Sequence, residues 1–202
     1  MTHFLKDLEF VSQRRGRQDD EYSCGVASFK MLLKYCINKK PKHLTILPTY
    51  GQLCKELHNS IPAQEKTYID KNVLDEYVPD DKTYGAYQED MIMYLKKMKI
   101  PFEMTRFIPF YKENDKTVID NKEKRLSGLL KLIERNIPVM VEIGWPQVEF
   151  GHWLVLRGYI QNGNKMYLYD PYKVKPLMHE KAWNKKDFLK SWDGISLCIS
   201  IT

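Results

Sequence analysis

The sequence predicts an α+β fold, because the periodicity of its apolar residues changes once along the chain. Up to about residue 136, apolar residues recur at spacings of three and four, which is typical of helices. After Pro138 the runs are short and rich in β-branched and aromatic residues, as in strands. We therefore expect a single domain over residues 1–202, with a helical lobe over about 1–136 and an antiparallel β-sheet lobe over about 137–202. A cleft between two such lobes is the usual place for a site.

Four helices are expected in the first lobe. They cover residues 22–37, 50–57, 88–98 and about 125–136. The first is well defined, because Val26, Phe29 and Leu33 share one helical face and Ser23 precedes them as a predicted N-cap. Prolines close the third and fourth segments, since proline and the residue before it disfavour helix.

The second lobe is expected to be a sheet with one short helix. Its strands cover residues 139–143, 151–159, 166–170 and 195–201, and the helix covers about 186–192. The segment Gln161–Asn164 joins the second and third strands as a turn, because Asn and Gly tolerate the positive φ of tight hairpins.

Charge and composition narrow the class of protein. The formal net charge of +6 comes mainly from lysines scattered along the chain, which indicates a solvated surface and makes nucleic acid an unlikely partner. No apolar run is long enough to cross a bilayer. Asp7 stands where a secretory signal would hold apolar residues, so the sequence predicts a cytoplasmic protein.

One short basic stretch departs from this even distribution. Arg14, Arg15 and Arg17 lie together just before Gln18. An exposed basic loop is the favoured interpretation, and an anionic partner at these three arginines is the alternative.

The four cysteines lack the paired spacing of a metal site, and we expect them to be reduced. Cys36, Cys54 and Cys198 have apolar neighbours and are interpreted as core residues. The sequence also has no His-Glu-x-x-His motif and no glycine-rich phosphate loop. It therefore predicts chemistry without a metal or a cofactor.

Cys24 has a different setting from the other cysteines. The polar residues Gln18 to Ser23 deliver it to the start of the first predicted helix. The helix dipole and the unpaired N–H groups at that position favour a thiolate. Cys24 is therefore the candidate nucleophile.

A cysteine nucleophile needs a base, a group that orients the base, and donors for the oxyanion. Only His152 opens a buried strand; the other histidines are terminal or in polar segments, namely His3, His43, His58 and His179. Asp170 ends the next apolar strand, where a buried acid needs a partner. Gln18, six residues before Cys24, is the candidate oxyanion donor together with the Cys24 backbone N–H.

Hairpin geometry makes the pairing of His152 with Asp170 testable. If Asn162 and Gly163 formed a two-residue loop, the two side chains would lie on opposite faces of the sheet. We therefore predict a loop of odd length or a bulge, which makes them diagonal neighbours about 7–8 Å apart at Cβ.

Three motifs in this order carry a resemblance. They are Gln18 with Cys24-Gly25 at a helix start, the stretch Gly151–Tyr159, and Tyr-Asp-Pro-Tyr at 169–172. Together they resemble the papain-like cysteine peptidases of the bacteriocin leader-processing type, the double-glycine peptidase-like family, and in particular its stand-alone members. The similarity extends over most of the chain.

The resemblance implies a papain-like two-lobed fold and cleavage of a peptide or amide bond through a thioester acyl-enzyme, with a peptide or protein as substrate and no cofactor. It implies Cys24 as nucleophile, His152 as base and later acid, Asp170 as the orienting residue and Gln18 as oxyanion donor.

Two other functions stay open at this point. An acyltransferase or transpeptidase would use the same residues and resolve the thioester with an amine or a thiol instead of water. A catalytically silent papain-like binding module would instead use Arg14, Arg15 and Arg17 for an acidic partner.

Overall fold

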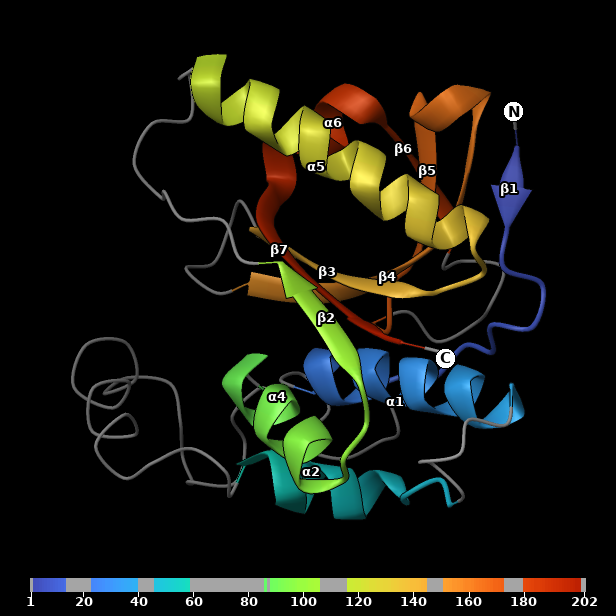
Figure 1. The fold of residues 1–202 in the computed structure, drawn as a ribbon, viewed down its shortest axis with the longest axis vertical. Helices are drawn as coiled ribbons and strands as arrows, with labels where there is room; N and C mark the ends of the chain where they lie inside the picture. Colours follow the sequence, from blue (N-terminus) through green and yellow to red (C-terminus); the bar gives the residue numbers. More distant parts are fainter. Residues whose placement is uncertain are drawn as a thin grey trace.

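The computed structural model describes residues 2–13, 23–39, 46–58, 86, 88–105, 116–144, 151–172 and 180–200. In these residues the chain forms five α-helices and one sheet of seven strands, all paired antiparallel (Figure 1). The predicted α+β class is thus confirmed.

The sheet has the strand order β2-β7-β3-β4-β5-β6, and β1 also pairs with β4. The strands are β1 (His3–Phe4), β2 (Phe102–Thr105), β3 (Val139–Gly144), β4 (Gly151–Ile160), β5 (Lys165–Tyr169), β6 (Glu180–Asn184) and β7 (Trp192–Ile199). The long strand β4 connects the two halves: its first part pairs with β3, and its second part pairs with β5 and β1. The start of β4, from Gly151 to Leu154, has β3 on one side and no paired residue of β5 on the other.

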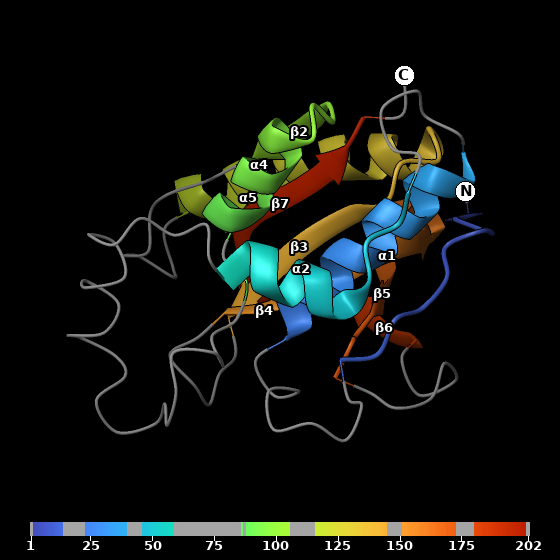
Figure 2. The same cartoon turned by 90° about the horizontal axis from the view of Figure 1, so that it is seen from below.

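Helices cover both faces of the sheet. They are α1 (Cys24–Asn38), α2 (Tyr50–His58), α4 (Gln88–Lys97), α5 (Lys116–Glu134) and α6 (Lys185–Ser191). Figure 1 shows α1, α2 and α4 below the sheet and α5 and α6 above it, and the view from below in Figure 2 shows α1 and α2 in front of β3 and β4. The central strands are therefore enclosed on both faces.

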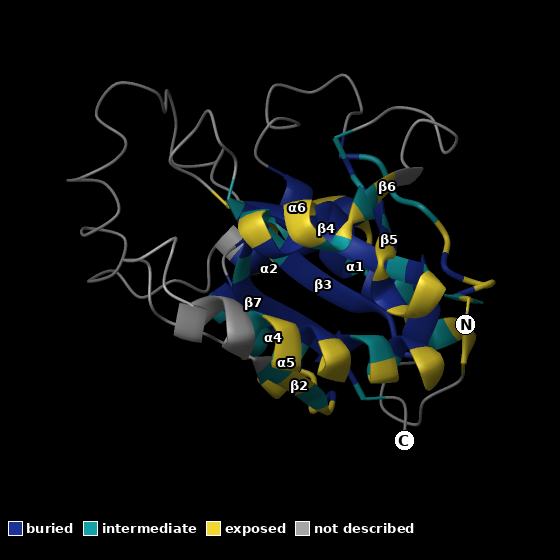
Figure 3. Cartoon of the chain, turned by 90° about the horizontal axis from the view of Figure 1, so that it is seen from above, coloured by how far each residue is buried: buried dark blue, intermediate teal, exposed yellow. Residues whose placement is uncertain are grey.

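The hydrophobic core lies on both sides of the central strands. In Figure 3, β3, β4 and β7 are buried along most of their length, whereas the outer sides of α5 and α6 are exposed. Phe29 and Leu32 of α1 and Val141 of β3 have no exposed surface. Each such side chain stabilises the fold by about 1.5–3 kcal/mol relative to an exposed one. The apolar face predicted for α1 is thus buried, and its Phe29 ring lies edge-on to the ring of Tyr94 in α4.

Local sequence signals explain where the helices begin and end. Asn184 caps α6, because its side-chain oxygen accepts a hydrogen bond from the Asp187 N–H at 2.8 Å. After α5, Asn136 adopts a left-handed conformation with φ 60° and Pro138 follows. Ser23 stands at the predicted N-cap of α1, but its side chain makes no capping hydrogen bond.

Some elements differ from the predictions in length. The helix predicted over 125–136 is α5, which begins at Lys116. The final strand begins at Trp192 instead of residue 195, because α6 ends at Ser191 without an intervening loop. The strands β1, β2 and β6 were not predicted.

The sheet also takes strands from both parts of the chain. β1 and β2 lie before residue 136 and pair with β4 and β7. The helix α5, also before that residue, lies on the opposite face of the sheet from α1 (Figure 1). Residue 136 is therefore not a boundary between helices and strands.

The hairpin of β4 and β5 contains the predicted bulge. Its loop has the even length of four residues, Gln161–Asn164, where Asn162 and Gly163 have the expected positive φ. The pairing then shifts by one residue between Leu156 and Gly158, so Arg157 is the extra residue of β4.

The first residues of the chain pack against this bulge. The Leu5 N–H donates to the carbonyl oxygen of Arg157 at 2.9 Å, which satisfies a backbone acceptor at the irregular position. A Cβ at Gly158 would lie 2.5 Å from the His3 carbonyl oxygen, so only glycine allows β1 to approach this closely. The N-terminal segment thus helps to hold the shifted register.

Candidate active site

Cys24 is the first residue of α1, as the sequence predicts, and it is 9% exposed. The start of this helix is held from a second helix, because the Tyr50 hydroxyl of α2 donates to the Ser23 carbonyl oxygen at 3.1 Å. The Ala27 N–H donates to the same oxygen at 2.9 Å. The thiol therefore sits at a fixed helix N-terminus, where the dipole favours negative charge.

The residue after Cys24 has to be glycine for a steric reason. A Cβ at Gly25 would lie 2.7 Å from the Ala86 carbonyl oxygen and 3.0 Å from the Met91 Cε. Ala86 therefore packs directly on the backbone beside Cys24. This contact explains the Cys-Gly pair in structural terms.

His152 is buried near the start of β4, with 6% of its surface exposed. Its Nε2 lies 2.8 Å from Oδ1 of Asp170, which directly follows β5. The bulge at Arg157 makes this contact possible, because it aligns Asp170 with Leu154 and so with the face of His152. The predicted diagonal pairing is confirmed.

The carboxylate of Asp170 is itself held in place. The Tyr172 N–H donates to Oδ1 at 3.0 Å, so this oxygen accepts two hydrogen bonds. Pro171 lies between Asp170 and Tyr172 in the chain, and its carbonyl oxygen accepts a hydrogen bond from the Gln13 N–H at 2.8 Å. The turn that carries Asp170 is thus attached to the N-terminal segment.

The same imidazole also contacts Cys24. Burial of the His152 ring opposes its positive charge, but hydrogen bonds to Asp170 and Cys24 raise its pKa to about 9. Because Nε2 faces Asp170, Nδ1 is the ring nitrogen left for the thiol. At neutral pH the imidazolium lies between a thiol group and a carboxylate, an arrangement that can stabilise a thiolate and move a proton.

Two of the other cysteines, Cys36 and Cys198, lie in apolar surroundings that disfavour a thiolate. All four cysteines are free thiols in the structure. Burial raises the pKa of Cys36 to about 12 and that of Cys198 to about 11. Neither thiol is suited to form a thiolate near neutral pH.

Several sequence predictions lie outside the described residues. These are Gln18, the candidate oxyanion donor, and the basic loop of Arg14, Arg15 and Arg17. Conversely, the supporting roles of Tyr50, Tyr172 and Gln13 were not predicted. No local pattern marks them. Tyr50 and Gln13 bond to carbonyl oxygens of residues far away in the sequence. Gln13 and Tyr172 act through the backbone N–H, which does not depend on the type of side chain.

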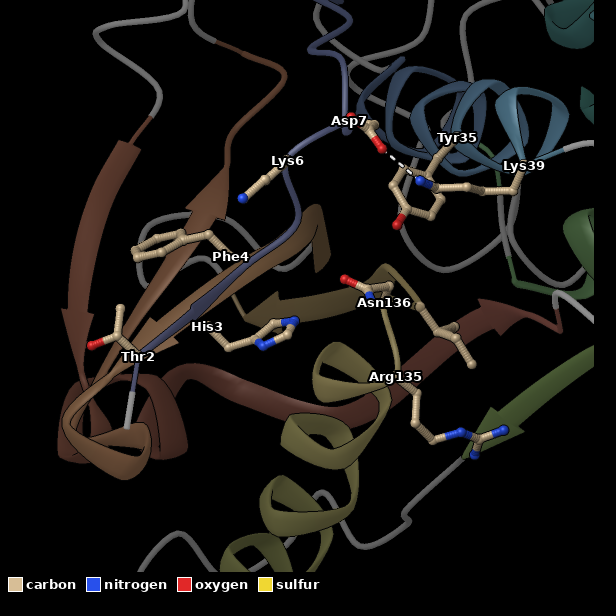
Figure 4. A pocket seen from close by; sticks show the side chains of 10 residues that line it. Thr2, His3, Phe4, Lys6, Asp7, Tyr35, Lys39, Arg135 and Asn136 are labelled. Atoms are coloured by element: carbon tan, nitrogen blue, oxygen red, sulfur yellow. Dashed lines mark hydrogen bonds and ion pairs between the residues drawn. The ribbon is translucent and has the colours of Figure 1, made fainter.

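A cavity of about 750 Å³ lies elsewhere on the molecule. Figure 4 shows the side chains of His3, Tyr35 and Asn136 around it, from β1, α1 and the residues after α5. Lys39 at its edge pairs with Asp7. None of the predicted site residues lines this cavity.

Within the described part of the chain, no cluster of three or more His, Cys, Asp or Glu side chains could hold a metal ion. Among the same residues, no helix has the length and apolar character needed to span a membrane.

Comparison with known proteins decides the family. The model of the Peptidase_C39 like family matches residues 5–197, nearly the whole chain. The chain belongs to this family. The C39-like chain shares its fold with a Bacillus anthracis protein assigned as a C39-like peptidase, at a TM-score of 0.62 and 16% identity, over 99% of this chain and 98% of that one.

A second solved structure is the peptidase domain of Streptococcus mutans ComA. It matches 57% of the C39-like chain and 75% of its own at 16% identity, with a TM-score of 0.36, which is too low to inform the fold. No curated protein matches the sequence.

The packing of Ala86 on Gly25 leads to a prediction for Gly25→Ala. The added methyl group overlaps the Ala86 carbonyl oxygen, so we expect a loss of about 1–3 kcal/mol in the free energy of unfolding. The matched control is Gly128→Ala in α5, where a Cβ meets nothing within 4 Å. That change should raise stability by about 0.5–1 kcal/mol. Urea denaturation measures both, and equal effects would contradict the packing argument.

The His152 pair should make stability depend on pH. The His152 pKa of about 9 lies above the ordinary value of 6.5. The pair with Asp170 therefore stabilises the folded state fully below pH 6.5, and this contribution is lost as the pH rises through 9. Asp170→Asn should therefore lower the free energy of unfolding by about 1–3 kcal/mol at pH 6, and by less at pH 10.

Urea denaturation at the two pH values measures this difference. Asp7→Asn, which removes a surface partner of Lys39, is the control and should have little effect at either pH. An Asp170→Asn effect of the same size at pH 6 and pH 10 would show that the His152 charge does not contribute.

Proposed function

We propose that this chain is a cysteine peptidase that cleaves a peptide or amide bond through Cys24, His152 and Asp170. The observation that carries the proposal is the position of one buried imidazole, hydrogen-bonded to both the Cys24 thiol and the Asp170 carboxylate. Membership of the C39-like family supports the same reaction class.

In the first half of the proposed reaction, the resting site holds a Cys24 thiolate and a His152 imidazolium. The Cys24 Sγ attacks the carbonyl carbon of the substrate and forms a C–S bond, and the carbonyl electron pair moves to oxygen. As the C–N bond breaks, the imidazolium gives its proton to the leaving amine. A thioester acyl-enzyme and a neutral His152 result.

In the second half, neutral His152 takes a proton from water, and the hydroxide attacks the thioester carbon. The C–S bond breaks, and the thiolate and imidazolium are restored with release of a carboxylic acid. Asp170 keeps the ring oriented and stabilises its charge in both halves, because its own position is held by the Tyr172 N–H.

The oxyanion of each tetrahedral intermediate needs hydrogen-bond donors. In the proposal these are the Cys24 backbone N–H, at the start of α1, and the side-chain amide of Gln18. The substrate is a peptide or protein. We propose that the reaction takes place in the cytoplasm and uses no cofactor.

Selective alkylation tests the nucleophile. Iodoacetamide should modify Cys24 well below pH 8 and at least about tenfold faster than Cys36 or Cys198, whose pKa values burial raises to about 12 and about 11. Peptide mass spectrometry locates and times the label on each cysteine, including Cys54. The matched variant His152→Ala should slow the labelling of Cys24 and leave the other cysteines unchanged. Equally slow labelling of all four cysteines in the wild-type protein would refute the assignment.

Turnover separates hydrolysis from acyl transfer. We expect a fluorogenic peptide library to yield products with a free carboxylate, and Cys24→Ala to abolish them. The same library is run with added amines or thiols and read by mass spectrometry. Products that carry the added amine or thiol would instead identify an acyltransferase. Reactive Cys24 without any turnover would point to a binding module.

A further inference from the structure

Ser28 of α1 makes a buried hydrogen bond to the strand that carries His152. Its hydroxyl donates to the Trp153 carbonyl oxygen at 3.0 Å, and the side chain has no exposed surface. Trp153 directly follows His152 in β4. The bond therefore joins α1 to the backbone of β4 beside the base.

Ser28 and Cys24 are four residues apart in α1, so they lie on the same face of the helix, one turn from each other. Cys24 contacts His152, and Ser28 contacts the next residue of the strand. Two contacts at adjacent strand positions restrict both sliding and rotation of the helix on β4. Apolar packing holds α1 in place, and these two contacts add a defined position along β4.

At the start of β4, the described sheet ladder pairs the strand on one side only. Residues Gly151–Leu154 pair with β3, but the pairing of β4 with β5 begins only at Val155. A buried hydroxyl is costly unless it is hydrogen-bonded, and this bond satisfies both the Ser28 hydroxyl and the buried Trp153 carbonyl oxygen. Because the bond is directional, it ties one position of α1 to one position of β4, which apolar packing alone does not do.

We propose that Ser28 is a positioning residue that fixes the distance between the Cys24 thiol and the His152 ring. This inference rests on the proposed function of those two residues. Ser28 touches no reacting atom; it acts through the backbone of β4. Among the described residues, the groups that act on the charge of His152 are Cys24 and Asp170, and neither is bonded to the Ser28 hydroxyl.

The test is the pH profile of Cys24 alkylation in Ser28→Ala. Misplacing reacting groups by about 1 Å is enough to cost about 100-fold in rate. We expect the rate constant below pH 8 to fall by about 10-fold to 100-fold and the midpoint of the profile to move to higher pH, because a looser contact with His152 stabilises the thiolate less.

Ser196→Ala is the matched control. Ser196 is also a buried serine, 3% exposed, but it lies in β7, and β3 separates that strand from β4. Both variants should lower the melting temperature, whereas only Ser28→Ala should change the pH profile. Unchanged profiles, or equal shifts in both variants, would overturn the proposal.

A second pair of variants covers the case in which Ser28→Ala does not fold. Thr and Val have nearly the same shape and differ by the hydroxyl. Ser28→Thr should keep the wild-type profile and Ser28→Val should shift it, measured on the folded fraction. Identical profiles for the two would show that the hydroxyl does not position the site.

Failure of this inference differs from failure of the proposed function. If wild-type Cys24 reacts selectively but the Ser28 variants keep its profile, only the positioning role is wrong. If Cys24 of the wild-type protein is not selectively reactive, both fail.

Discussion

The register between β4 and β5 is the constraint on which the candidate site depends. Beyond the bulge, towards the loop, Gly158 pairs with Tyr167, and a ladder continued in that register would place His152 and Asp170 on opposite faces. The extra residue Arg157 shifts the pairing by one. His152 and Asp170 then share a face and form their 2.8 Å contact. A single irregular residue in the sheet thus decides whether the pair can exist.

The N-terminal segment supports that register at two points, although it precedes the candidate nucleophile in the chain. Near the bulge, the Leu5 N–H satisfies the Arg157 carbonyl, and the Arg157 guanidinium lies over the ring of Tyr169 at 5.1 Å. At the other end, the Gln13 N–H holds Pro171, next to Asp170. Because buried backbone groups need partners, the segment is a structural part of the site.

Electrostatics explains why His152 needs two partners. A buried imidazolium is costly in a low-dielectric interior, and desolvation is the largest single influence on its pKa. Hydrogen bonds to both Asp170 and Cys24 outweigh this cost and leave the ring charged near neutral pH. The low dielectric that penalises an isolated charge also strengthens these contacts. The site is therefore sensitive to the placement of α1, which carries the thiol, relative to the strands.

Local signals in the sequence were sufficient for the α+β class, most helices and the main strands, and they named Cys24, His152 and Asp170 as candidates. These signals are short-range: periodicity, turn residues and the polarity of neighbours. They could not reveal β1, β2 and β6, which are short strands; β1 and β2 also pair with strands far along the chain. Ser28, a polar residue one turn after Cys24, was visible in the sequence, but its partner is a carbonyl 125 residues away. The sequence alone left two choices for this hairpin, a loop of odd length or a bulge. Only the tertiary structure decided for the bulge, because its Arg157 carbonyl oxygen is hydrogen-bonded by Leu5, which belongs to a distant segment of the chain.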